Sequence, residues 1–155
     1  MPKLLGFAGL LPQIAFCAAA WAGPSEWREA AMVGALAYAA LIFTFLGGTW
    51  WGMAATAPAA EGRGALGWVW IAAVLPSLIA LAVILAALGG LSLPGREPVA
   101  SALLVLGPLI GASTLVDSLL SPGGRPAIAP AWWPRLRWPL SLGLGALTVA
   151  TALAL

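Results

Sequence analysis

Long apolar runs separated by short polar or Pro- and Gly-rich connections dominate the chain. Each run is close to the roughly 20 residues that a helix needs to cross the hydrocarbon core of a bilayer. The pattern predicts five membrane-spanning helices, at about residues 4–22, 33–56, 66–88, 98–120 and 138–155. We therefore expect an all-α integral membrane protein in which residues 1–155 form one transmembrane domain, a bundle of five helices.

Composition supports lipid as the solvent and excludes several classes of function. Hydrophobic residues make up 62% of the chain and charged residues 8%, against about 25% charged in a soluble domain. The net charge of +2 and the scattered basic residues do not suit nucleic-acid binding. The chain has no His and one Cys, so we expect no metal site, no cofactor, no catalytic residues and no enzyme activity.

The basic residues predict the orientation in the membrane, because Lys and Arg are enriched in cytoplasmic loops. Five predicted spans place the two termini on opposite sides. The N-terminal side carries more basic residues than the other side, which predicts an inner-membrane protein with the N-terminus inside and the C-terminus outside. The N-terminal side has Lys3, Arg63, Arg125, Arg135 and Arg137, and the other side has Arg28 and Arg96.

The first span also resembles a secretory signal peptide. Lys3 precedes an apolar run that ends in Ala20-Trp21-Ala22, a sequence typical of a cleavage site. We expect this segment to be retained as the first helix of the bundle.

Two pairs of glycines predict close helix packing. Gly48 and Gly52 are four residues apart, as are Gly107 and Gly111. This spacing lets two membrane helices approach backbone to backbone, and Gly47 widens the first strip. The pairs are expected to join the spans at 33–56 and 98–120 within the chain; the alternative is that they bind another membrane protein.

Asp117 is the only carboxylate inside a predicted span. An intramembrane carboxylate is costly, so it is a candidate proton relay or ion site. Because it lies three residues from the end of its span, we favour a structural anchor that pairs with Arg135 or Arg137. Gln13 beside a Pro is a second polar residue in a span, and we expect a local hydrogen bond to a neighbouring helix.

Tryptophans gather near the predicted inner interface, where Trp side chains anchor helices at headgroup depth. Trp50 and Trp51 are candidates for a pocket that binds a flat ligand, although ordinary anchoring is the favoured interpretation. The segment after residue 131 alternates aromatic and basic residues, which predicts an interfacial elbow with guanidinium groups on lipid phosphate. Its residues are Trp132, Trp133, Arg135, Arg137 and Trp138.

Several motifs, in their order along the chain, resemble those of a membrane protein family called domain of unknown function 3429. The most specific is Phe45-Leu46-Gly47-Gly48-Thr49-Trp50-Trp51-Gly52; others are Leu5-Gly6-Phe7-Ala8-Gly9-Leu10-Leu11-Pro12, Pro76-Ser77-Leu78 and Trp132-Trp133-Pro134-Arg135-Leu136-Arg137. The resemblance covers most of the chain and implies a multispan membrane protein akin to transmembrane protein 69 of animals. It implies no activity and no catalytic residue. Trp50 stands where the resemblance leads us to expect His or Arg.

These features favour a non-catalytic role. We expect an accessory or assembly subunit whose partners are the bilayer and other membrane subunits or further copies of itself. The alternative is a binder or transporter of a lipid, pigment or quinone that uses the inner Trp cluster, Gln13 and Asp117.

Overall fold

The computed structural model describes residues 2–57, 66–125 and 127–154, and within these ranges every regular element is a helix. The predicted all-α fold is confirmed. The helices, in chain order, are α1 (Pro2–Ala8), α2 (Leu11–Ala22), α3 (Ser25–Thr56), α4 (Gly67–Leu88), α5 (Pro98–Leu120) and α6 (Trp133–Ala152).

Four helical segments are long and apolar enough to cross a membrane, which is consistent with a membrane location. They are Leu4–Ala22, which combines α1 with α2, and the helices α3, α4 and α5. With 32 residues, α3 is about 48 Å long, well beyond the hydrocarbon thickness of about 30 Å. The remaining helix, α6, is less apolar because Arg135 and Arg137 lie in its first two turns.

The start of α6 differs from the prediction. The helix begins at Trp133, five residues before the expected boundary. Pro134 explains the difference, because proline fits the first helical turn, where its fixed φ suits the helix and no N–H partner is needed. Most of the expected interfacial elbow is therefore helical.

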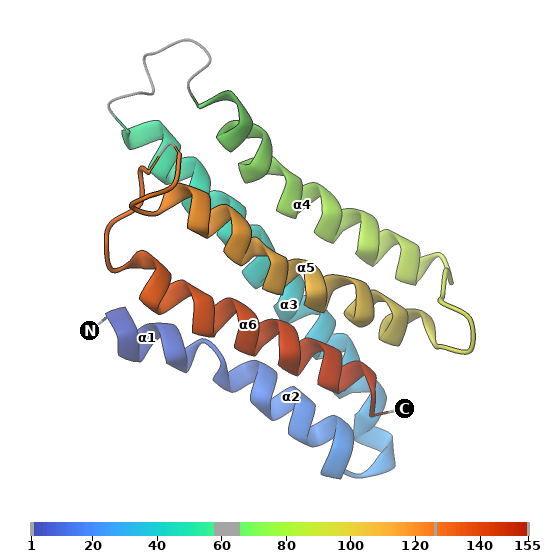
Figure 1. Cartoon of the computed structure of the whole chain (residues 1–155). Coiled ribbons are helices and arrows are strands. Elements are labelled where there is room, and N and C mark those ends of the chain that lie inside the picture. The colour runs from blue at the N-terminus through green and yellow to red at the C-terminus, as the bar shows by residue number, and fades with distance from the viewer. Residues whose placement is uncertain (1, 58–65, 126, 155) are drawn as a thin grey trace.

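The helices lie roughly along one direction, with α6 beside α5 on one side and beside α1 and α2 on the other, while α3 crosses behind them (Figure 1). The first helix begins and the last helix ends at opposite ends of the bundle (Figure 1). Fully buried aliphatic side chains of α3 and α5 form the centre of the core. They include Leu46, Leu103, Leu106 and Ile110.

A break separates α1 from α2. Pro12 has no N–H to donate to the carbonyl of Ala8, so the backbone cannot continue as one regular helix there. The hydroxyl of Tyr38 in α3 donates a hydrogen bond to the carbonyl of Gly9, which is in the break. A side chain of α3 thus satisfies a backbone group that the break leaves open.

The glycine pairs do not face each other, so the expected joining of 33–56 to 98–120 through them is wrong. Gly107 packs against α6: a Cβ added there would lie 2.8 Å from the carbonyl oxygen of Gly145. A Cβ added at Gly111 would lie 3.9 Å from the side chain of Leu142, also in α6. The closest backbone approach through glycine in α5 therefore joins it to α6 rather than to α3.

The glycines of α3 divide between two faces of the helix. Gly47 lies against the carbonyl of Ala73 in α4, and no side chain would fit between them. Gly48 and Gly52 are exposed, and nothing within the described chain lies within 4 Å of a Cβ added at either position. Among the described residues, the Gly48/Gly52 pair is therefore uncovered on the outer surface of the bundle.

Candidate functional site

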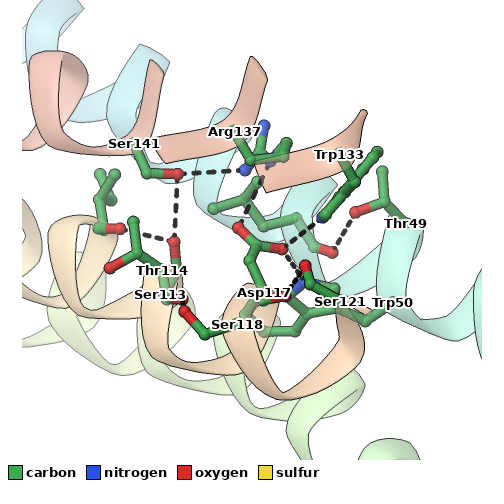
Figure 2. Close-up of polar contacts among 12 residues, drawn as sticks. Thr49, Trp50, Ser113, Thr114, Asp117, Ser118, Ser121, Trp133, Arg137 and Ser141 are labelled. Atoms are coloured by element: carbon green, nitrogen blue, oxygen red, sulfur yellow. Dashed lines mark hydrogen bonds and ion pairs between the residues drawn. The ribbon is translucent and has the colours of Figure 1, made fainter. Parts of the chain in front are cut away.

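A buried carboxylate marks the end of the bundle where the chain begins. Asp117, in the last turn of α5, has no exposed surface. Its Oδ1 accepts hydrogen bonds from the indole Nε1 of Trp50 in α3 and from that of Trp133 in α6, both at 2.9 Å (Figure 2). Three helices are therefore joined through one oxygen atom.

The positive partner of this carboxylate is also buried. Arg137 in α6 is only 8% exposed, and its Nε lies 3.6 Å from Oδ2 of Asp117. Its guanidinium carbon lies 5.4 Å from the centroid of the Trp133 ring, which is within the range of a cation–π contact. The ion pair brings no net charge into the bundle, which limits the cost of burying either group.

Serines extend the cluster along α5 and α6. Nη2 of Arg137 donates to Oγ of Ser141 at 3.3 Å, and the hydroxyls of Ser141 and Ser113 are 3.3 Å apart (Figure 2). Ser113 also donates to the carbonyl of Ile110 at 2.6 Å. Because a hydroxyl has one proton, Ser113 can donate to only one of these two acceptors at a time.

Two atoms of the ion pair have no hydrogen bond among the described residues. They are Oδ2 of Asp117 and Nε of Arg137, which face each other beyond hydrogen-bond distance. The described residues contain no group of three or more His, Cys, Asp or Glu side chains that could hold a metal ion. The arrangement provides N–H donors around one carboxylate, and it holds α3, α5 and α6 together.

The candidate polar and ligand residues do not all converge. Trp50 is 2% exposed and donates a hydrogen bond to Asp117. Trp51 is half exposed, and the centroid of its ring lies 4.7 Å from the centroid of the Trp70 ring in α4. Gln13 is fully buried in α2, where its Nε2 donates to Thr148 Oγ1 at 3.2 Å. Gln13 and Asp117 therefore belong to different contacts, and Gln13 has the expected hydrogen bond to a neighbouring helix.

The predicted interfacial segment needs a correction. Trp133 and Arg137 point inward to Asp117 rather than to lipid phosphate, because they lie on the face of α6 that packs on α5. Arg135 is exposed, and Trp132 and Trp138 are 49% and 46% exposed, as an interfacial location requires. Only these three residues remain candidates for the lipid interface.

Sequence reasoning gave no special role to Tyr38, Ser113 or Ser141. Ser141 lies on the small, weakly polar face of the last span, and its seven-residue spacing from Thr148 is the one available signal. Tyr38 is the only tyrosine in the chain, and it stands inside a long apolar run. A single hydroxyl in such a run indicates a partner in another helix, although it does not identify that partner.

Comparison with known proteins gives one positive result. No curated protein and no solved structure matches the chain. The likeness to transmembrane protein 69 thus stays a prediction. The model of a family described as protein of unknown function (DUF3429) matches residues 1–153, and the chain belongs to this family.

Proposed function

We propose that this protein is a non-catalytic accessory or assembly subunit that docks another membrane helix on the exposed glycine face of α3. The docked helix belongs to a partner subunit or to a second copy of the chain. The observation that carries the proposal is that no described residue covers Gly48 and Gly52, which are on successive turns of one helix.

The cost of glycine supports a role for this face. Each glycine inside a helix destabilises it by roughly 0.5–1 kcal/mol relative to alanine. Gly47 and Gly107 offset that cost through close contacts with α4 and α6. Gly48 and Gly52 have no such contact within the described chain, and a second backbone packed against them would supply one.

The side chains beside the pair complete a docking groove. Leu41 and Phe45 are 66% and 62% exposed on the same side of α3, and Trp51 is half exposed. Large side chains next to a glycine strip form a ridge beside a groove, the shape that a second helix fills.

The proposed location is the inner membrane, with the N-terminus inside. Arg137 is buried in an ion pair and no longer counts as a loop charge. The N-terminal side still has Lys3, Arg63, Arg125 and Arg135, against Arg28 and Arg96 on the other side. Arg63 lies outside the described residues, so its contribution rests on sequence alone.

Native purification tests the proposal. The tagged protein is isolated in mild detergent from its native membrane, and intact-complex mass spectrometry gives the composition. We expect stoichiometric membrane subunits or a homo-oligomer with the wild type, and loss of that assembly in Gly48→Leu, whose side chain fills the groove.

A matched variant separates docking from a general effect of added bulk. Ala112→Leu places the same side chain on an exposed position of α5 and should leave the assembly intact. A monomeric wild type, or an assembly that survives Gly48→Leu, would contradict the proposed docking.

A further inference from the structure

A cavity of about 240 Å³ lies between the α1–α2 break, α3, α5 and α6. Most of its lining is apolar; the polar groups come from Arg137 and Ser141. Leu5 and Phe45 at its edge are 73% and 62% exposed, so the cavity opens sideways toward the hydrocarbon of the membrane. None of the tryptophans lines it; Arg137 is the residue that it shares with the cluster around Asp117.

The polar groups at this cavity have donors to spare. A guanidinium has five N–H donors. Of these, Nη2 of Arg137 is bonded to Ser141, and Nε, which is 3.6 Å from Oδ2 of Asp117, has no hydrogen bond among the described residues. The Ser141 hydroxyl lies 3.3 Å from that of Ser113. A molecule that enters the cavity must therefore supply an oxygen acceptor.

The net charge of the site determines whether the acceptor group of the ligand is charged or neutral. Asp117 already neutralises Arg137, and two indoles donate to that carboxylate. A ligand carboxylate or phosphate would leave an excess negative charge in an apolar site, which is costly. A neutral carbonyl oxygen accepts the free donors without changing the net charge.

The volume and apolar lining of the cavity determine how much of the ligand it can enclose. A volume of 240 Å³ is below the roughly 300–1,000 Å³ of sites that enclose a drug-sized ligand. The cavity therefore accommodates a head group or a short part of a chain, and the remainder of the molecule extends past Phe45 into lipid.

We infer that this cavity binds an uncharged, carbonyl-bearing amphiphile, with the carbonyl oxygen on Arg137 and the apolar tail toward the bilayer. Two membrane components have this chemistry: a quinone and the acyl ester of a lipid. The inference does not rest on the docking proposal, because no glycine of the Gly48/Gly52 pair lines the cavity; Phe45 is the one residue that the cavity and the proposed docking groove share.

The test is a ligand titration of the purified full chain in dodecyl maltoside, a detergent with no carbonyl group. Bound ligand is counted by native mass spectrometry. The probes are a decyl-substituted benzoquinone, methyl decanoate, decanoic acid and decylbenzene. We expect saturable 1:1 binding of the quinone, the ester or both; whichever binds identifies the source, and decylbenzene should bind at least about tenfold more weakly because it has no acceptor.

Variants locate the site; the two isoleucine variants leave the residues of the ion pair unchanged. Ile42→Trp fills the cavity from α3 and should weaken binding about tenfold or more, whereas Ile71→Trp, on the exposed face of α4, should not. Arg137→Lys keeps the positive charge beside Asp117 and removes the guanidinium donors, so it should weaken the carbonyl probes and not decylbenzene.

Three outcomes would overturn the inference. The first is no saturable binding of either carbonyl probe. The second is tighter binding of ionised decanoic acid than of the quinone and the ester. The third is equal binding to wild type and Ile42→Trp, with Ile42→Trp shown by circular dichroism to be folded.

Discussion

The two ends of the bundle satisfy their polar side chains in different ways. At the end where the chain begins, side chains of three helices bond to one another around Asp117. At the opposite end, side-chain donors reach backbone carbonyls in the last turns of α2 and α6. The pairs there are Trp21 with Ala150 (2.8 Å), Arg28 with Ala20 (3.2 Å) and Arg96 with Ala152 (3.5 Å).

This difference predicts how much each contact contributes to the free energy of unfolding. The last carbonyls of a helix have no intrahelical partner and carry partial negative charge, so nearby donors are favourable but replaceable by water near a helix end. The Asp117 cluster is buried, and removal of one member leaves its partners unpaired in an apolar surrounding. Similar donors should therefore contribute more at the first end than at the second.

The largest effect should come from Asp117→Ala. This change leaves the Arg137 guanidinium buried without its counter-charge, and we expect a loss of about 3–5 kcal/mol in the free energy of unfolding. Denaturant unfolding in detergent, followed by circular dichroism, measures it. A loss below about 1 kcal/mol would contradict the argument that this end depends on the ion pair.

Neutral replacements separate charge from hydrogen bonding. Asp117→Asn keeps an oxygen for the two indoles and still leaves Arg137 unpaired, so its loss should be smaller. The double variant Asp117→Asn with Arg137→Gln removes both charges, and it should recover part of the loss caused by Asp117→Asn alone. If Asp117→Asn leaves stability and assembly unchanged but abolishes an activity of the complex, Asp117 acts as a relay.

The next effect should come from Trp133→Phe. The substitution keeps the ring beside Arg137 and removes the N–H that donates to Oδ1 of Asp117. A hydrogen bond to a charged group contributes about 1.5–3 kcal/mol, and we expect a loss in this range by the same unfolding measurement. Trp138→Phe is the control, because Trp138 is 46% exposed on the same helix.

The sequence predicted the helices better than it predicted which side chains face inward. Apolar run lengths located the spans because lipid imposes a minimum helix length. Trp50 and Trp51 are adjacent in sequence and about 100° apart on the helix, so one bonds to Asp117 and the other faces outward. In a membrane helix both faces are apolar, so hydrophobic periodicity does not distinguish the two.

The same limit applies to the candidate site. The pairing of Asp117 with an arginine near the start of the last helix followed from its depth in the predicted span. Whether Arg137 or Arg135 pairs with Asp117 depends on where α6 begins. With Pro134 in its first turn, α6 begins at Trp133, inside the segment that was expected to be an elbow. The cavity could not be predicted from the sequence, because segments far apart in the chain form its walls. These are the break at Gly9, the side of α3 that carries Ile42 and Phe45, and two turns of α6.

The smallest effect in this comparison should come from Trp21→Phe. Trp21 uses the same indole donor as Trp133, but its acceptor is the neutral carbonyl of Ala150, and 59% of its surface is exposed. We expect a loss of about 0.5–1.5 kcal/mol in the free energy of unfolding, with no loss for Trp27→Phe, which is similarly exposed on α3. Because all four variants make the same chemical change, their differences report the surroundings of the indole. Equal losses for Trp21→Phe and Trp133→Phe would mean that the buried charge adds nothing, and the contrast between the two ends would fail.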